Sequence, residues 1–444
     1  MSIFKAYDIR GVYPDELDEE LMRKIGNAVA QFLDADRILV SRDMRDSGVS
    51  LCEAFIEGET DAGVECVDAG LLSTPGNYFA IANYDFPGGV SITASHNPRQ
   101  YNGLKVSREN AIPVGSESGL AEIEKMATGG VYKSATAKGK VTKIEVLEDL
   151  KKHVLSFAGD IEPLNVVIDA SNGMAGLVLP PVLDELPVKS ERLYFELDGT
   201  FPHHEANPLK EAALLDLQKA VREKKADLGV CFDGDADRCA FVDEAGRIIP
   251  SDLVTAVIAR DYLEKDPGAL ILYDVRSSRA VREEIEAAGG RAMPERVGHA
   301  FMKATLREKN GLFAGELSGH YYFRDNFYCD SACIGFLRML TVLSKADKPL
   351  SEVIAPLRRY SNTGEVNFRV EDKDARIREI AAKFADADLS YLDGITVEYP
   401  DWWFNVRKSN TEPLLRLVLE ADTDEKRDEG FARVKEILGE PAEE

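Results

Sequence analysis

The stretch RILVSRDMRDSG, residues 37–48, is an apolar, β-branched run that ends in a polar turn. Two later stretches follow the same plan, LNVVIDASNGMAG at 164–176 and ALILYDVRSSRAV at 269–281. In each, the apolar run predicts a strand, and the residues after the turn predict the start of a helix. Strands that alternate with helices form parallel sheets covered by helices. The recurrence therefore predicts three related α/β domains.

The last part of the chain has a different pattern. ITVEYP (395–400), WWFNVR (402–407) and LLRLVLEA (414–421) predict strands, and DARIREIAAKFADA and DEKRDEGFARVKEIL predict amphipathic helices. A strand-rich segment with two helices predicts a smaller α+β domain from about residue 363 onward.

The composition bounds the function. The chain of 444 residues is 44% hydrophobic and 30% charged, as expected for a globular protein of several domains. Its formal net charge of −24 argues against nucleic acid or an anionic membrane as a partner. Any cleft that binds phosphate must therefore gather positive charge of its own.

The sequence also indicates the cellular location of the protein and the redox state of its cysteines. No apolar run is long enough to cross a bilayer, and the start, MSIFKAYDIRGVYP, lacks the pattern of a signal peptide. Six cysteines in a chain of this length do not form a disulfide framework, so buried thiols are expected. These features predict a cytoplasmic protein, and no obligate protein partner is predicted.

The segment DLGVCFDGDADRCAFVDEAG (227–246) is the most informative one. Two apolar runs predict two strands, and between them Asp233, Asp235 and Asp237 occupy alternate positions. Three carboxylates this close repel one another unless a cation neutralises them. A hard divalent ion with oxygen ligands is the natural occupant. Arg238, beside it, is placed to hold a phosphate that the metal also contacts.

Two alternatives for this loop are weaker. An ordinary Asp-Gly hairpin with solvated acids accounts for one aspartate, but not for three at alternate positions between apolar strands. An EF-hand loop that starts at Asp233 would place Glu244 at position twelve. However, its sixth position, normally Gly, is Arg238, and its flanks are strands.

GGVSITASHNPRQYNGLKV (88–106) places Ser95 directly after another apolar strand. The serine lacks the G-x-S-x-G elbow of α/β-hydrolases, and the chain lacks a Walker or kinase glycine loop. His96 is adjacent in sequence, which usually directs its side chain elsewhere, and a Ser-His pair alone most often belongs to a polar turn. A serine and a metal loop without a nucleotide site favour phosphoryl transfer to and from the protein itself.

VRKSNTEPLLRL (406–417) has the composition of a phosphate site. Arg407 and Lys408 supply charge, and Ser409, Asn410 and Thr411 supply hydrogen-bond donors in a turn between two predicted strands. Taken alone, an ordinary turn closed by proline would be the better interpretation.

FAGELSGHYYF (313–323) has the composition of a sugar site. Glu316, Ser318 and His320 occupy alternate positions of an extended loop, where they can hydrogen-bond neighbouring sugar hydroxyls. A polar hairpin loop is an equally good interpretation of this stretch alone.

Seven motifs occur in order along nearly the whole chain: AYDIRG (6–11), TASHNP (93–98), YNGLKV (101–106), DGDADR (233–238), VGHAFMK (297–303), GELSGH (315–320) and RKSNTEP (407–413). This set resembles that of the α-D-phosphohexomutase family. It is most similar to the phosphomannomutase/phosphoglucomutase branch, because phosphoglucosamine mutases typically carry Gly in place of Asn410 and Gln in place of Leu317. Leu104 and Ala300 depart from the family pattern, but neither removes a group that the chemistry needs.

The resemblance implies four domains around a central cleft, which we expect at residues 1–147, 148–250, 251–362 and 363–444. They would carry, in order, the phosphoserine, metal, sugar-binding and phosphate-binding loops. Ser95 would carry the phosphoryl group and bind Mg²⁺ together with Asp233, Asp235 and Asp237. The other implied catalytic residues are Arg10, Lys105 and His299. The implied substrate-binding residues are Arg238, Glu316, Ser318, His320, Arg407, Ser409, Asn410 and Thr411.

The resemblance also implies a reaction. A hexose 1-phosphate and a hexose 6-phosphate, of mannose, glucose or both, would interconvert through phospho-Ser95 and a hexose 1,6-bisphosphate. Glucose or mannose 1,6-bisphosphate would prime the enzyme. Three alternatives stay open: a phosphoglucosamine mutase, a Mg²⁺-dependent sugar phosphatase and a non-catalytic sugar-phosphate binding protein.

Overall fold

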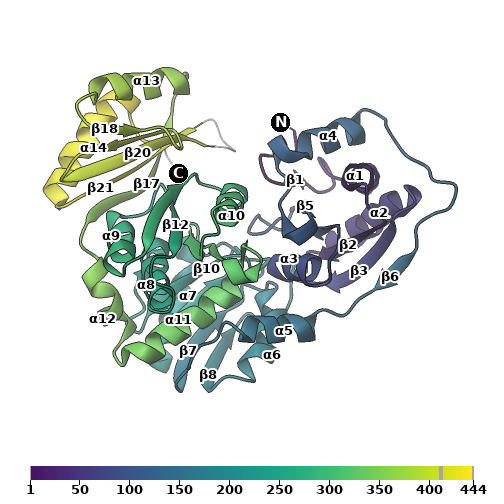
Figure 1. Ribbon diagram of the computed structural model, residues 1–444, viewed down its shortest axis with the longest axis horizontal. Coiled ribbons are helices and arrows are strands. Elements are labelled where there is room, and N and C mark those ends of the chain that lie inside the picture. Colours follow the sequence, from purple (N-terminus) through teal and green to yellow (C-terminus); the bar gives the residue numbers. More distant parts are fainter. Residues whose placement is uncertain (1, 410–413, 443–444) are drawn as a thin grey trace.

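The computed structural model describes residues 2–409 and 414–442. The chain folds into three related α/β domains and a smaller C-terminal α+β domain, each built around one sheet, so the predicted fold class is confirmed. In Figure 1, domain I (purple to blue) lies on the right, domains II and III (teal and green) fill the centre, and domain IV (yellow) lies at the upper left.

Domain I contains six strands and four helices. The strands are β1 (Ile9–Val12), β2 (Arg37–Arg42), β3 (Glu65–Leu71), β4 (Gly88–Ile92), β5 (Tyr101–Arg108) and β6 (Val141–Lys143). The helices are α1 (Glu19–Leu33), α2 (Gly48–Asp61), α3 (Thr74–Asn83) and α4 (Leu120–Thr128).

Domains II and III contain five strands each. Domain II has β7 (Leu164–Asp169), β8 (Val188–Leu193), β9 (Leu228–Phe232), β10 (Cys239–Asp243) and β11 (Ile248–Ile249), with α5 (Leu147–Leu155), α6 (Ala175–Leu183) and α7 (Glu211–Lys224). Domain III has β12 (Leu270–Asp274), β13 (Arg291–Glu295), β14 (Phe313–Gly315), β15 (Tyr321–Phe323) and β16 (Cys329–Asp330). Its helices are α8 (Ser251–Leu263), α9 (Arg279–Ala287), α10 (His299–Glu308), α11 (Ala332–Ala346) and α12 (Leu350–Ile354).

The first three sheets share one plan. Each has a central parallel strand, β2, β7 or β12, that pairs with the next strand on one side and with β4, β9 or β14 on the other. That third strand turns back through a hairpin into the antiparallel β5, β10 or β15. The three stretches that predicted a repeat supply the central strands and the helices α2, α6 and α9 that follow them.

Domain IV is a separate antiparallel unit. Its strands are β17 (Ser361–Arg369), β18 (Asp388–Ser390), β19 (Ile395–Glu398), β20 (Trp402–Lys408) and β21 (Leu414–Ala421), and its helices are α13 (Lys373–Lys383) and α14 (Asp424–Leu438). The buried apolar residues of this domain form their own cluster.

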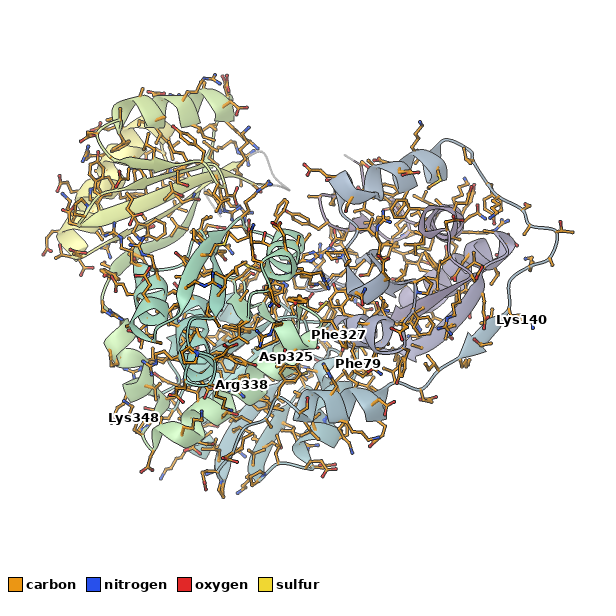
Figure 2. All side chains as sticks on the ribbon, in the orientation of Figure 1. Phe79, Lys140, Asp325, Phe327, Arg338 and Lys348 are labelled. Carbon is orange, nitrogen blue, oxygen red and sulfur yellow. The ribbon has the colours of Figure 1, made fainter. Side chains whose placement is uncertain are left out.

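By contrast, one continuous apolar cluster runs from α3 of domain I through domains II and III. At the junction, the His153 ring lies near those of Phe79 and Phe327, with ring centroids 4.8 Å and 5.7 Å away. Figure 2 labels these two phenylalanines close together near the centre of the molecule. Apolar burial therefore fixes domains I–III to one another.

The joint between domains III and IV is polar. The backbone N–H of Arg279 donates to Glu420 (2.9 Å), and its guanidinium donates to the carbonyl of Pro400 (3.0 Å). Arg282 pairs with Glu398 at 3.2 Å. Across residues 2–409 and 414–442, no helix is both long and apolar enough to cross a membrane.

Helices α1 and α2 cross at two glycines. A Cβ at Gly26 would lie 2.2 Å from the carbonyl oxygen of Phe55, and one at Gly58 would lie 1.9 Å from that of Arg23. Because backbone cannot move aside as a flexible side chain can, we expect Gly58→Ala to destabilise domain I by about 1–3 kcal/mol. Hydrogen exchange of α1 and α2 peptides in the full chain measures this loss.

Gly48→Ala is the matched control in the same helix, because its nearest atom would lie 3.7 Å away. We expect it to change the opening free energy by no more than about 0.5 kcal/mol. Equal exchange rates for Gly58→Ala and the wild type would contradict the close crossing.

Glu59 in α2 predicts a pH dependence of stability. Its side chain is fully buried, and neither carboxylate oxygen has a hydrogen-bond partner in the described part of the chain. Burial raises the pKa of Glu59 well above its ordinary value, although the nearby Cys66 thiol opposes the shift. Above the ordinary pKa the unfolded chain releases this proton while the folded chain keeps it, so stability falls as the pH rises.

Glu59→Gln removes this proton uptake and keeps the shape of the side chain. We therefore expect the variant to gain in unfolding temperature over the wild type progressively between pH 5 and pH 8, as measured by differential scanning calorimetry. A pH-independent difference between the two proteins would show that Glu59 ionises normally.

Candidate active site

Three hairpin loops at equivalent places in the first three sheets meet at one cleft. The β4–β5 loop carries Ser95, the β9–β10 loop carries the three aspartates, and the β14–β15 loop carries Glu316. The cleft has a volume of about 770 Å³, which is in the range of small-molecule sites. All the described residues that line it come from domains I–III.

The lining of the cleft is balanced in charge. Its basic side chains are Lys5, Arg10, Lys105 and Arg238, and its acidic ones are Asp8, Glu16, Asp237 and Glu316. The expected local excess of positive charge is therefore absent from the described lining, because Asp8 and Glu16, which the sequence did not assign to the cleft, also line it. Asp8 pairs with Arg10 at 2.7 Å.

The three aspartates converge as the spacing predicts. Ligand oxygens of Asp233, Asp235 and Asp237 lie within 4.8 Å of one another, and all three side chains are buried. The hydroxyl of Ser95 donates to Asp233 at 3.0 Å. The structure therefore brings the expected nucleophile and the expected metal ligands, from two different domains, into one cluster.

Lys105 of β5 provides the positive charge of this cluster. Its ammonium donates to Asp235 at 2.8 Å and to Asp237 at 2.5 Å. Burial acts to lower the pKa of Lys105, but the two carboxylates outweigh it and hold the pKa well above its ordinary value. Burial, Asp237 and Asp235 raise the pKa of Asp233 well above its ordinary value.

The cluster fits a divalent metal ion. The Oδ1 atoms of Asp235 and Asp237 are buried and have no hydrogen-bond partner among the residues that the structure describes. Each such group costs free energy unless something binds it. The donors are all oxygens, which Mg²⁺ prefers. The ammonium of Lys105 and the guanidinium of Arg238, which lies 3.7 Å from Asp237 and 3.8 Å from Asp233, still leave the three carboxylates short of neutrality.

Ser95 has an uncommon backbone conformation. Its φ is +52°, in the left-handed region that residues other than glycine seldom adopt. Its hydroxyl lies 3.3 Å from Nδ1 of His96. The expectation that His96 points elsewhere is therefore wrong, because the left-handed turn brings the two adjacent side chains to the same side.

Arg10 and His299 lie in the cleft near the cluster. Arg10 is held by Asp8 and donates to Asn97 at 2.5 Å, in the loop that carries Ser95. Nδ1 of His299 is buried and has no hydrogen-bond partner within the described part of the chain. Burial, followed by the charges of Lys303 and Lys105, lowers the pKa of His299 well below its ordinary value, so the imidazole is neutral.

The expected sugar loop is already hydrogen-bonded within the protein. Glu316 accepts from the backbone N–H of Gly298 (3.0 Å) and from the hydroxyl of Tyr322 (2.5 Å). His320 contacts Ser318 at 2.9 Å through Nδ1, and its Nε2 lies 3.2 Å from Nε of Arg238. His320 thus connects the sugar loop to the metal loop.

The described members of the expected phosphate loop, Arg407, Lys408 and Ser409, are not among the described residues that line the cleft. Arg407 pairs with Glu365 at 2.7 Å, and Ser409 is buried at the end of β20. Lys408 pairs with Asp374 at 2.6 Å. Asn410 and Thr411 lie outside the described residues, so their predicted roles stay predictions.

Two residues near the site, Thr74 and Arg276, could not be assigned to it from the motifs. Thr74 donates to Asp235 at 2.6 Å, and nothing in its surroundings distinguishes it in sequence. Arg276 lies 3.5 Å from Glu365 and joins domain III to the pair made by Arg407. The repeat contained a signal for Arg276, because it follows a central strand at the position that Arg45 has in domain I.

Comparison with known proteins identifies the domains. The profile for phosphoglucomutase/phosphomannomutase alpha/beta/alpha domain I matches residues 1–131, that for domain II matches 145–246, that for domain III matches 250–360, and that for the C-terminal domain matches 365–437.

Relatives match over nearly the full length. Phosphohexose mutases of Xanthomonas campestris pv. campestris are 39% identical, over 95% of each chain. A phosphomannomutase of Vibrio cholerae is 37% identical over 95% of this chain and 94% of its own, and one of Methanocaldococcus jannaschii is 36% identical over 99% and 98%. The crystal structure of a phosphoglucomutase/phosphomannomutase family protein from Burkholderia thailandensis has a TM-score of 0.90 and 32% identity, and covers 99% of this chain and 98% of that one.

The four domains and these relatives define the protein as a phosphohexomutase, which is an isomerase. The chain belongs to the phosphoglucomutase/phosphomannomutase family, so the resemblance inferred from the motifs is confirmed.

The unpartnered oxygens predict the effect of removing one aspartate. Asp235→Asn deletes a charge that the cluster offers to a cation, so we expect the Mg²⁺ affinity to fall about ten-fold or more. Isothermal titration of the full chain with MgCl₂ measures it. Asp46→Asn, at an exposed carboxylate outside the cluster, should leave the affinity unchanged. Equal Mg²⁺ affinity for Asp235→Asn and the wild type would exclude Asp235 as a ligand.

Proposed function

We propose that the protein interconverts the 1- and 6-phosphates of mannose, glucose or both, with phosphorylated Ser95 as the phosphoryl donor. The observation that carries the proposal is the 3.0 Å contact between the Ser95 hydroxyl and Asp233, inside a buried tri-aspartate cluster that borders the cleft. The relatives named phosphomannomutase support mannose phosphates as substrates, and the family description supports glucose phosphates as well.

In the first transfer, a free sugar hydroxyl attacks the phosphorus of phospho-Ser95. The bond to the serine oxygen breaks as the bond to the sugar oxygen forms, which leaves Ser95 free and yields a hexose 1,6-bisphosphate. The hydroxyl proton goes to the neutral imidazole of His299, which lines the cleft. Arg10 and Lys105 stabilise the negative charge of the transferring group.

The acidic cluster would hold a metal ion during this step. Asp233, Asp235, Asp237 and an oxygen of Ser95 are the proposed Mg²⁺ ligands. When bound, Mg²⁺ would supply positive charge to the phosphoryl oxygens.

In the second transfer, the other phosphate of the bisphosphate returns to Ser95, so the sugar must turn around in the cleft. Glu316, Ser318, His320 and Arg238 are proposed to bind the sugar and the phosphate near the metal. Arg407, Ser409, Asn410 and Thr411 are proposed to bind the phosphate that does not react. The separate apolar core and polar joint of domain IV support a pivot that admits and releases this phosphate.

Three further parts belong to this proposal. Glucose or mannose 1,6-bisphosphate primes the free enzyme by phosphorylating Ser95. The domains divide at residues 1–147, 148–250, 251–362 and 363–444. The protein works in the reducing cytoplasm, which its six free, buried cysteines support.

The test is ³¹P NMR of the Mg²⁺-loaded enzyme with a trace of glucose 1,6-bisphosphate. Mannose 1-phosphate, glucose 1-phosphate and glucosamine 1-phosphate are offered in separate tubes, and we expect the first two to convert to 6-phosphates. Ser95→Ala should lower the rate by about 10³-fold or more, because the group that accepts the phosphoryl is gone. Ser50→Ala, in α2, is the matched control and should keep the wild-type rate.

Each other outcome identifies an alternative. Growth of inorganic phosphate alone indicates a sugar phosphatase, and conversion of glucosamine 1-phosphate alone indicates a phosphoglucosamine mutase. No change in any tube leaves a binding protein for these sugars. Turnover by Ser95→Ala at the wild-type rate would overturn the role of Ser95.

A further inference from the structure

Arg45 encloses the backbone of the Ser95 loop from behind the cleft. Its guanidinium is fully buried and donates to four carbonyl oxygens of one loop. The acceptors are Ser95 (2.8 Å), Asn97 (2.6 Å), Pro98 (3.0 Å) and Tyr101 (3.0 Å). Arg45 does not line the cleft, so its contacts with the reaction run through this loop.

Asp43 and Thr93 complete the enclosure. Asp43 accepts from the backbone N–H of Arg45 (3.0 Å) through one oxygen, and from the hydroxyl of Thr93 (2.6 Å) through the other. The Thr93 hydroxyl in turn accepts from the backbone N–H of Ser95 at 2.9 Å. Both the N–H and the C=O of Ser95 are therefore fixed by buried side chains from the turn after β2 and the end of β4.

This enclosure explains the left-handed backbone of Ser95. A residue other than glycine persists in that conformation only where its surroundings determine it. The side chains of Arg45 and Thr93 bind the backbone groups on the two sides of the strained residue. They thereby set the direction in which the hydroxyl meets Asp233.

The same turn recurs in domains II and III, after the central strand of each sheet. In domain II, Asp169 accepts from the N–H of Ser171 (2.8 Å), and the Ser171 hydroxyl donates to the carbonyl of Phe232 (2.6 Å), directly before the metal loop. In domain III, Asp274 accepts from the N–H of Leu317 (2.8 Å), inside the sugar loop. In every repeat, the last residue of the central strand or the turn that follows it hydrogen-bonds the backbone of that domain's functional hairpin.

We propose that Arg45 is a positioning residue for phosphoryl transfer. The turn that contains Arg45 is the domain I copy of a contact that occurs in all three α/β domains and holds the functional loop of each in place. This inference rests on the proposed role of Ser95. The guanidinium satisfies four carbonyls at once because its donors lie in a fixed planar fork, which a lysine ammonium cannot reproduce.

The positioning role has a specific kinetic signature. Loss of Arg45 frees the Ser95 loop but leaves the sugar loop of domain III in place. Misplacement of the reacting oxygen by about 1 Å can lower the rate about 10²-fold. We therefore expect Arg45→Lys and Arg45→Ala to lower kcat by about that factor and to change the KM for mannose 1-phosphate by less than about three-fold. Guanidinium chloride at non-denaturing concentration should partly restore kcat in Arg45→Ala alone.

The matched control is Arg42→Lys, three residues earlier at the end of β2. Arg42 is half-buried and donates to the carbonyl of Asp43 outside the Ser95 loop, so kcat should stay at the wild-type value. Unchanged kcat in both Arg45 variants would overturn the proposal. So would a loss that appears in KM, or one that guanidinium fails to restore.

A second pair of variants decides the question if the Arg45 variants do not fold. Thr93→Val keeps the shape of the side chain but removes the hydroxyl that accepts from Ser95, and Thr93→Ser keeps that hydroxyl. We expect kcat to fall about ten-fold or more in Thr93→Val and to stay within about three-fold in Thr93→Ser. Equal kcat in the two variants would overturn the proposal.

Phosphopeptide mapping by mass spectrometry distinguishes failure of the proposed function from failure of the positioning role of Arg45. Each protein is incubated with Mg²⁺ and glucose 1,6-bisphosphate and then digested. If the wild type carries no phosphate on Ser95, the proposed function fails and the positioning role fails with it. If the wild type is phosphorylated there and the Arg45 variants turn over normally, only the positioning role is wrong.

Discussion

The contact of the Lys105 ammonium with Asp235 and Asp237 is the interaction on which the site depends. It places one cation from domain I among three buried carboxylates from domain II. Without it, three buried carboxylates would have only the more distant guanidinium of Arg238 as a counter-charge in a low-dielectric interior, at a cost of several kcal/mol. With it, the loop stays folded and still lacks enough positive charge to be neutral, which is the condition for binding a divalent ion. The same contact holds Ser95 against Asp233, because β4 and β5 are neighbours in one hairpin.

The three loops converge because one hairpin occurs three times. In each α/β domain the third parallel strand turns back into an antiparallel strand at the same edge of the sheet. One copy carries a serine, one carries carboxylates and one carries a glutamate and a histidine, so identical backbone plans present different chemistry. A shared apolar core then fixes the three domains with these hairpins facing one cleft.

Much of this could be predicted from local sequence. The central strands follow from apolar runs before polar turns, and the metal loop follows from three aspartates at alternate positions, since both signals lie within a few residues. The partners of His320 and the pairing of Arg407 with Glu365 could not be predicted, because they join residues that only domain packing brings together. The predicted excess of positive charge in the cleft was wrong for the same reason, because nothing in the local sequence assigns Asp8 and Glu16 to the cleft that they line. The prediction that the His96 side chain points away from Ser95 was wrong, because it did not include the left-handed turn at Ser95. That turn depends on Arg45, some 50 residues earlier.

The joints between domains I–III differ in kind from the joint to domain IV. Domains I–III share buried apolar surface, whereas the joint to domain IV is polar and includes the partly exposed pair of Arg282 and Glu398 as well as the buried carboxylate of Glu420. Exposed charge pairs weaken as dissolved ions screen them over about 8–10 Å. Ionic strength therefore acts on the joint to domain IV, while the cleft formed by domains I–III keeps its geometry. The freedom of domain IV to move can therefore change with the salt of the medium without any change in the groups that line the cleft.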